Sequence, residues 1–270
     1  VALSALGGDQ LFLGYNAHRI LWAAQSADRM MPFGMNRWLA GVFGGLVDDG
    51  IPWGERTRAV EMLRAMPNWG AVYGILRNVW DSPAMRRAVY GPRMLDANPP
   101  ASFEWLSKHF PSGVGGVQAA REFEFRNKMV NDLLWNEDRV SMRVGLEVRV
   151  PFLDWDLVAT CNRKSVRELM PMGRAKHALK SLARGIVPEP VLRRQKSGFQ
   201  LDVVDVFGST LAPLFDAYLS DEVVHRHGLF SMSFVQEVMK HRGDRRWRWH
   251  FFLLYLMAQT HIFMDEYELS

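Results

Sequence analysis

Apolar residues at helical spacing constrain the fold of this chain more than any other sequence feature. Between positions 35 and 90 they return every three or four residues, which places them on one face of a helix. Two such runs are Val60, Leu63, Met66 and Val72, Ile75, Leu76, Val79. Of the 270 residues, 48% are apolar, enough to build a substantial core. The pattern predicts short packed helices, with boundaries at Pro52 and Pro67.

Longer elements are predicted at both ends of the chain. The first residues, Val1 to Ser4, are expected to form a buried strand, and a helix with Asp9 as its N-cap should follow to about Ala27. A helix is also predicted over 118–135, and a buried one over 247–263. The fold is therefore expected to be mainly α. Such a segment would remain if an α/β domain were cut after its sheet.

Composition excludes several classes of protein. The single cysteine, Cys161, rules out an internal disulfide and a cysteine-based zinc cluster, and we expect it to be a core residue. No two histidines have zinc-ligand spacing with a supporting acid, and no serine lies in a nucleophile-elbow pattern. With no apolar run of about 18 residues and no signal peptide, we expect a cytoplasmic protein that has no membrane partner. The net charge of +4 suits an anionic ligand.

The first candidate site is the run from Ser4 to Tyr15, where small residues join a strand to a helix. Backbone amides in such a turn can approach a nucleotide or phosphate, and Asp9 can face a bound Mg²⁺. A tight turn capped by Asp9, without a ligand, accounts for the same residues.

The second candidate segment runs from Asn131 to Asp154 and includes Asp138. Alternating apolar residues and the proline at 151 predict an extended stretch. Glu147 and Arg149 would then share one side and pair. Because apolar residues flank them, we expect both to be buried and to hold the loop beneath a site as supporting residues.

A third segment is basic. Lys176, Lys180 and Arg184 lie four residues apart, which would place them on one helix face, and Arg193, Arg194 and Lys196 follow. Like charges at this spacing repel by roughly 0.2–0.5 kcal/mol per pair, so the arrangement fits either an anionic ligand or a well-solvated face. A lysine near a transferring phosphoryl or adenylyl group would neutralise the developing charge.

The segment from Arg245 to Trp249 alternates arginine with tryptophan. Such a segment can bind single-stranded nucleic acid by stacking and phosphate contacts, which leaves open a helical nucleic-acid-binding module. It is also typical of the start of a core helix whose arginines extend to solvent. We favour the core helix and expect no nucleic-acid partner.

Together the three segments resemble the asparagine synthetase family. The first is similar to its Ser-Gly-Glu-Gly-x-Asp-Glu-Leu-Phe-x-Gly-Tyr motif, the second to Leu-Glu-x-Arg-Val-Pro-Phe-Leu-Asp and the third to Lys-x-x-Leu…Arg-x-Lys-x-Gly-Phe. The resemblance implies a partial synthetase domain over 1–270, the C-terminal part of an α/β adenine-nucleotide alpha-hydrolase-like (ATP pyrophosphatase) fold. It also implies nucleotide contacts from Ser4, Ala5, Leu6 and Gly7, binding of Mg²⁺ and pyrophosphate by Asp9, catalysis by Lys176, and supporting roles for Asp138, Glu147, Arg149, Lys180 and Lys196.

Two departures from the family pattern matter. Leu6 stands where the family has a glutamate, and Ala5 and Gln10 replace a glycine and a second glutamate. The altered motif is more similar to the asparagine-synthetase-like amidotransferases associated with exopolysaccharide. The family's pyrophosphate loop and glutaminase domain are expected before Val1, so we expect this chain alone not to catalyse the full reaction.

The resemblance implies a ligase that uses ATP and Mg²⁺ to convert a small-molecule carboxylate into an acyl-adenylate. Ammonia from glutamine, released by a glutaminase domain of the parent chain, would then give an amide. The carboxylate would be aspartate or, as the alternative, a sugar acid or other precursor of a cell-surface polymer. In either case Asp9 and Lys176 should face one cleft.

Overall fold

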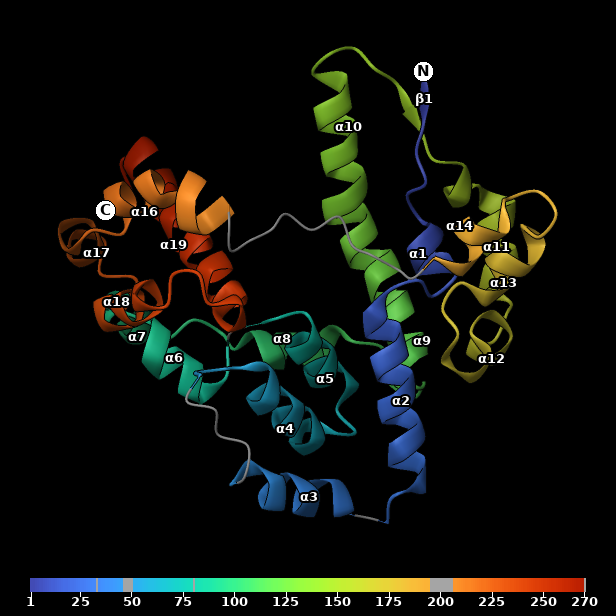
Figure 1. Ribbon diagram of the computed structural model, residues 1–270, viewed down its shortest axis with the longest axis horizontal. Helices are drawn as coiled ribbons and strands as arrows, with labels where there is room; N and C mark the ends of the chain where they lie inside the picture. The colour runs from blue at the N-terminus through green and yellow to red at the C-terminus, as the bar shows by residue number, and fades with distance from the viewer. Residues whose placement is uncertain (33, 46–50, 80, 195–205, 270) are drawn as a thin grey trace. The chain divides into compact units, whose positions relative to one another are not determined.

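A computed structural model describes residues 1–32, 34–45, 51–79, 81–194 and 206–269 (Figure 1). The described residues are mainly helical, as the apolar spacing predicted. They form two compact units. Unit 1 comprises Val1–Trp38, Arg64–Arg77 and Leu106–Lys196, and unit 2 comprises Leu39–Leu63, Asn78–Trp105 and Ser197–Ser270.

Unit 1 contains every residue of the candidate site that the structure describes. Its core forms where α2 packs against α9 and α5, around Leu21, Val72 and Ala119, which are fully buried. The elements of this unit are β1 Ala2–Leu3, α1 Gly8–Leu11, α2 Asn16–Met30, α5 Trp69–Leu76, α9 Gly116–Phe123, η1 Glu124–Leu134, α10 Trp135–Met142, β2 Val148–Arg149, η2 Pro151–Leu153, α11 Trp155–Asn162, α12 Val166–Leu169, η3 Pro171–Gly173, α13 His177–Leu182 and α14 Glu189–Arg193.

Unit 2 is organised around its last helix, α19, whose residues Phe251, Leu254 and Met257 are buried. This confirms the buried helix predicted near the end of the chain. Within the described ranges, no helix is both long and apolar enough to cross a membrane. The elements are α6 Pro83–Val89, α7 Pro92–Ala97, η4 Val206–Thr210, α16 Ala212–Tyr218, α17 Asp221–His227, α18 Met232–Lys240, η5 Arg245–Trp247 and α19 Arg248–Glu266; α3 Met35–Gly44, α4 Glu55–Ala65 and α8 Ser102–His109 contribute residues to both units.

The helix predicted from Asp9 to Ala27 is two helices. The break between α1 and α2 follows from the backbone of Leu13, which has a φ of 55°, a value incompatible with a continuous right-handed helix. The N-cap is Gly7, with a φ of 92°, and Asp9 lies in the first turn of α1. The predicted capping role of Asp9 is therefore wrong, and its carboxylate is available for another interaction.

The long helix predicted over 118–135 is present and extends further at both ends. It runs through α9, η1 and α10, and Figure 1 shows α10 continuing from α9 as one rod. The middle segment, Glu124–Leu134, has π-helical hydrogen bonding. Such widened turns are rare and frequently occur at functional sites.

The strand predicted at the beginning of the chain exists, but it is not buried. Val1 and Leu3 are 77% and 75% exposed. β1 pairs in parallel with β2, Ala2 opposite Val148 and Leu3 opposite Arg149. A two-stranded sheet leaves its side chains exposed when no layer covers it. The pairing ties the first candidate motif to the second.

Candidate functional site

Asp9 and Lys176 come together in unit 1 as the sequence analysis expected. The Lys176 Nζ lies 2.7 Å from Asp9 Oδ1, and the side chains are 28% and 21% exposed. A partly buried ammonium beside a carboxylate keeps a strong local field while staying accessible to a ligand. The pair is therefore the centre of the candidate site.

The backbone on both sides of the pair fixes its geometry. Lys176 adopts a left-handed conformation, with a φ of 53°, and its N–H donates to the Phe12 carbonyl at 3.1 Å. Gly14 donates its N–H to the Asp9 carbonyl at 2.7 Å. A Cβ at Gly14 would collide with the Asp9 carboxylate and with the Lys176 side chain. Glycine is thus required at this position for the pair to form.

The turn that precedes Asp9 presents mostly backbone. Ser4 Oγ accepts a hydrogen bond from the Leu6 N–H at 3.3 Å, and Ala5 is exposed. Gly7 is buried with a positive φ, and a Cβ there would collide with Leu153. The Ser4 N–H donates to the Arg149 carbonyl and the Gly8 N–H to the Ala5 carbonyl, so hydrogen bonds fix the turn in front of Asp9.

The second motif supports the first, but through apolar contacts and strand pairing. Phe152 meets the Phe12 ring edge-on, with centroids 6.0 Å apart. Glu147 and Arg149 are 58% and 66% exposed, so the prediction that they are buried is wrong. They do pair, with Arg149 Nε donating to Glu147 Oε1 at 2.8 Å. The uncovered face of β2 accounts for their exposure, and Asp138 is likewise exposed on α10.

The predicted basic helix face is not formed. Only Lys180 lies within α13; Lys176 precedes this helix with a left-handed backbone, and Arg184 follows it. Because φ changes sign at Lys176, the three side chains cannot share one helical face. Arg193 pairs with Glu189 at 2.8 Å. Lys196, together with Gly198 and Phe199, lies outside the described residues.

A buried polar cluster that was not predicted from the sequence lies near Asp9. The charge of the Asp9 carboxylate affects the pKa values of its residues. The Tyr73 hydroxyl donates to Glu124 Oε1 at 2.7 Å, and His18 Nε2 lies 3.7 Å from Glu124 Oε2. His18 and Glu124 are fully buried. Burial lowers the pKa of His18 to about 4, and it raises the pKa of Glu124 above its usual range.

Two further cations surround Tyr15 at the edge of this cluster. The Lys128 Nζ is 5.2 Å and the Arg77 Cζ 6.0 Å from the centre of its ring. The Tyr15 hydroxyl accepts from Gln10 Nε2 at 2.8 Å, and burial raises its pKa to about 12. Together with Lys176, these cations make the surroundings of Asp9 suitable for a polyanion. Glu124 stands between Phe123 and Phe125, which was the available sequence signal for the cluster.

The site can accommodate a magnesium ion only with help from a ligand. Among the described residues no group of three or more His, Cys, Asp or Glu side chains could hold a metal. Mg²⁺ commonly takes one or two carboxylates and completes its shell with water and substrate phosphates. A single accessible carboxylate, Asp9, beside a lysine fits that mode of binding.

In unit 2, the segment from Arg245 to Trp249 is occupied by internal contacts. Trp247 is buried and stacks on His241, with ring centroids 4.1 Å apart. Arg246 pairs with Asp244, and Arg248 pairs with Glu55. These contacts support the interpretation of this segment as the start of a core helix.

Comparison with known proteins identifies a synthetase-type domain and its family. The chain matches the family described as Asparagine synthase over residues 1–262. It belongs to that family. No solved structure matches the chain significantly.

Its relatives are named as synthetases. It is 27% identical to asparagine synthetase [glutamine-hydrolyzing] 1 of Bacillus subtilis (strain 168) over 206 residues, which are 75% of this chain and 31% of that protein. It is 27% identical over 207 residues to a putative asparagine synthetase [glutamine-hydrolyzing] of Mycobacterium tuberculosis (strain ATCC 25618 / H37Rv), covering 75% of this chain and 30% of the relative. The chain thus spans less than a third of the length of these relatives.

Proposed function

We propose that this chain forms part of an ATP-dependent synthetase that converts a carboxylate into an amide. A carboxylate oxygen attacks the α-phosphorus of ATP, and the bond to the β-phosphate breaks to release pyrophosphate. Ammonia derived from glutamine then attacks the acyl carbon and AMP leaves. The observation that carries the proposal is the 2.7 Å contact between Lys176 Nζ and Asp9 Oδ1 in a cationic surrounding.

Lys176 is the group that stabilises charge in this proposal. Negative charge develops on the leaving pyrophosphate, and a fixed ammonium stabilises it without reorganisation. Mg²⁺, when bound, supplies further charge neutralisation on the phosphate oxygens. Asp9 would hold that ion, and the Ser4–Gly7 turn would contact the nucleotide through its backbone. Family membership supports each of these assignments.

The acceptor carboxylate is proposed to be other than free aspartate. Leu6 occupies the turn beside Asp9 and carries no group that can hydrogen-bond an amino acid. The proposed acceptor is therefore a sugar acid or another precursor of a cell-surface polymer. This choice follows the resemblance to exopolysaccharide-associated amidotransferases. The pyrophosphate loop and a glutaminase domain would be supplied by the rest of a longer, cytoplasmic parent chain.

Isotope transfer in the full-length parent tests this function. The enzyme would be given Mg-ATP, glutamine and either aspartate or galacturonate whose carboxylate is labelled with ¹⁸O. Adenylation predicts AMP and pyrophosphate as products, with one ¹⁸O in AMP, and a higher rate with galacturonate. Asp9→Asn is the control that should abolish label transfer. Formation of ADP and phosphate, or AMP without label, would refute the adenylation step.

A further inference from the structure

A pocket separate from the Asp9–Lys176 site lies on unit 1. Asp9, Tyr15 and Lys176 are not among its lining residues. It is bounded by residues of α2, α9 and α12 and by the turn η3, and its volume is about 470 Å³. Pockets of roughly 300–1,000 Å³ are typical of small-molecule sites. The size of this pocket is therefore suited to a small organic ligand.

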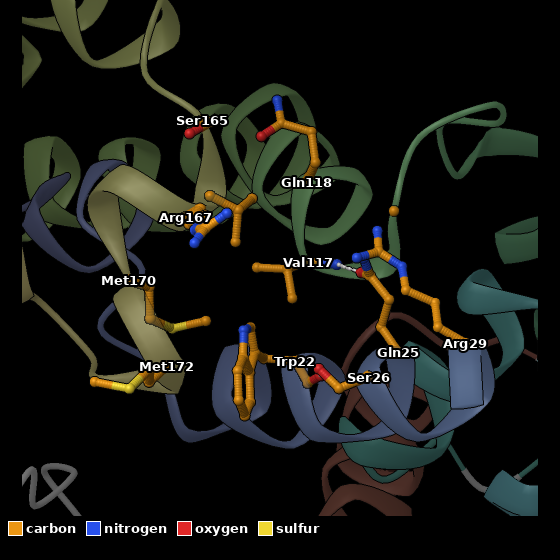
Figure 2. Close-up of a pocket in the computed structure, with 12 residues that line it drawn as sticks. Trp22, Gln25, Ser26, Arg29, Val117, Gln118, Ser165, Arg167, Met170 and Met172 are labelled. Carbon is orange, nitrogen blue, oxygen red and sulfur yellow. Dashed lines mark hydrogen bonds between the residues drawn. The ribbon is translucent and has the colours of Figure 1, made fainter. Parts of the chain in front are cut away.

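Part of the pocket lining is apolar. The indole of Trp22 packs against Gly173, where a Cβ would lie 2.9 Å from the ring, and Met172 is largely exposed. Figure 2 shows Trp22, Val117, Met170 and Met172 around a common space. A flat indole face and flexible thioethers adapt well to an aromatic or aliphatic group.

The rim of the pocket is positively charged. Arg29 and Arg167 are both exposed, and Figure 2 shows them on opposite sides of the pocket. Neither forms an ion pair within the described part of the chain, and the pocket lining contains no Asp or Glu. The acid beside Arg167, Glu168, is engaged by the Ser165 N–H at 2.9 Å and by its hydroxyl. Two arginines with spare donors favour a carboxylate or another planar anion.

We propose that this pocket binds a small organic anion that carries an apolar ring or chain. The apolar group would lie on Trp22 and contact Met172, with Met170 directly behind that surface, while a guanidinium of the rim holds the anionic end. The assignment is independent of the proposed synthetase function, because it uses none of the residues of the Asp9–Lys176 site.

Methionine-methyl NMR of this chain tests the proposal with 4-phenylbutyrate as the probe. The 15 methionines would be ¹³C-labelled, and Met170 and Met172 would be assigned with their leucine variants. The ligand efficiency usual for a compound of about a dozen heavy atoms predicts a Kd of about 2 mM. We expect saturable shifts at Met170 and Met172. The uncharged 4-phenylbutyramide should bind about tenfold more weakly, because it loses the charge-assisted hydrogen bonds.

Charge variants locate the anionic end. The double variant Arg29→Gln/Arg167→Gln should bind 4-phenylbutyrate about tenfold more weakly. Its affinity for 4-phenylbutyramide should be unchanged. Arg19→Gln, an exposed arginine on the same helix α2 outside the pocket, is the matched control and should bind as the unmodified chain does. Equal affinity for acid and amide, an unchanged affinity in the double variant, or shifts spread over methionines of both units would each overturn the proposal.

Discussion

The two ion pairs contributed by the family motifs differ in how the fold holds them. Asp9 and Lys176 are distant in sequence, partly buried and fixed by backbone bonds on both sides. Glu147 and Arg149 are two residues apart and largely exposed. Their contact distances are nearly the same, 2.7 and 2.8 Å. Distance alone therefore does not identify a functional pair; the surrounding protein determines how strongly the charges act on a ligand.

The comparison also shows where support for the site comes from. The segment that carries Glu147 and Arg149 does hold the Asp9 turn in place. It does so through the strand pairing of β1 with β2 and through Phe152 and Leu153 against the turn. The exposed charges contribute little to this packing. The following predictions test the difference between the two pairs, beginning with the largest effect.

Removal of the lysine charge should have the largest effect. In the full-length parent, Lys176→Ala should lower the rate of pyrophosphate release by roughly 10²–10³-fold, because an electrostatic stabiliser acts where charge develops. Glutaminase activity should largely remain. Lys176→Arg should restore little, since a planar guanidinium places its charge differently. Lys240→Ala, which removes an exposed lysine of unit 2, is the matched control. A Lys176→Ala enzyme with an unchanged rate would move the assignment to Lys180 or Lys196.

Addition of a single methyl group should separate Asp9 from Lys176. Gly14→Ala places a Cβ against both side chains, and a displacement of about 1 Å in a catalytic group can cost about 10²-fold in rate. We expect a loss of about 10–10²-fold in pyrophosphate release by the parent enzyme. Gly41→Ala is the control, because nothing lies within 4 Å of a Cβ at that position. Equal rates of pyrophosphate release for the two variants would show that the contact between Asp9 and Lys176 does not contribute to this step.

Loss of a buried hydrogen bond should destabilise unit 1, unlike loss of the exposed ion pair. Tyr73→Phe removes the donor to Glu124, and leaving a buried acceptor unpaired costs about 1–3 kcal/mol. The buried thiol of Cys161 reports the opening of this unit through its rate of chemical labelling. Arg149→Ala should leave that rate unchanged. Equal acceleration in the two variants would contradict the contrast between buried and exposed groups.

A smaller change in the stability of unit 1 is expected for each unit of pH. The unfolded chain binds a proton at His18 near pH 6.5, whereas burial lowers the folded pKa to about 4. The stability from this group is therefore complete above pH 6.5 and is lost as pH falls toward 4, by about 1.4 kcal/mol per pH unit. Glu124, whose pKa is raised by burial, opposes this trend. Comparison with His18→Gln by Cys161 labelling isolates the histidine. A variant with the same pH dependence as the unmodified chain would refute this contribution.

The sequence identified features that depend on local pattern. Helical spacing predicted the mainly α fold and the buried helix α19, and the ordered motifs led to the Asp9–Lys176 pair. It did not identify features that depend on the tertiary environment. Glu147 and Arg149 were expected to be buried because apolar residues flank them, yet both side chains are more than half exposed in the described part of the chain. The cluster of Tyr73, His18 and Glu124 joins segments whose proximity no spacing reveals.

The predicted basic helix face of Lys176, Lys180 and Arg184 was wrong for a related reason, which lies in the backbone. Spacing of four places side chains on one face only if the helix is continuous, and the left-handed backbone of Lys176 breaks it. That break directs the lysine toward Asp9 and away from Lys180. A strained conformation of this kind is characteristic of functional sites and is not visible in a periodic pattern.

In the proposed reaction, Asp9 and Lys176 act on the same metal-bound pyrophosphate. A double-mutant cycle in the full-length parent tests it most directly, with pyrophosphate release measured for Asp9→Asn, Lys176→Ala and the double variant at saturating Mg-ATP. Residues that act as a unit are strongly non-additive. The account predicts that the double variant loses no more than about threefold beyond the slower single variant. Single effects that multiply in the double variant would show that the two residues act independently, and would contradict a shared site.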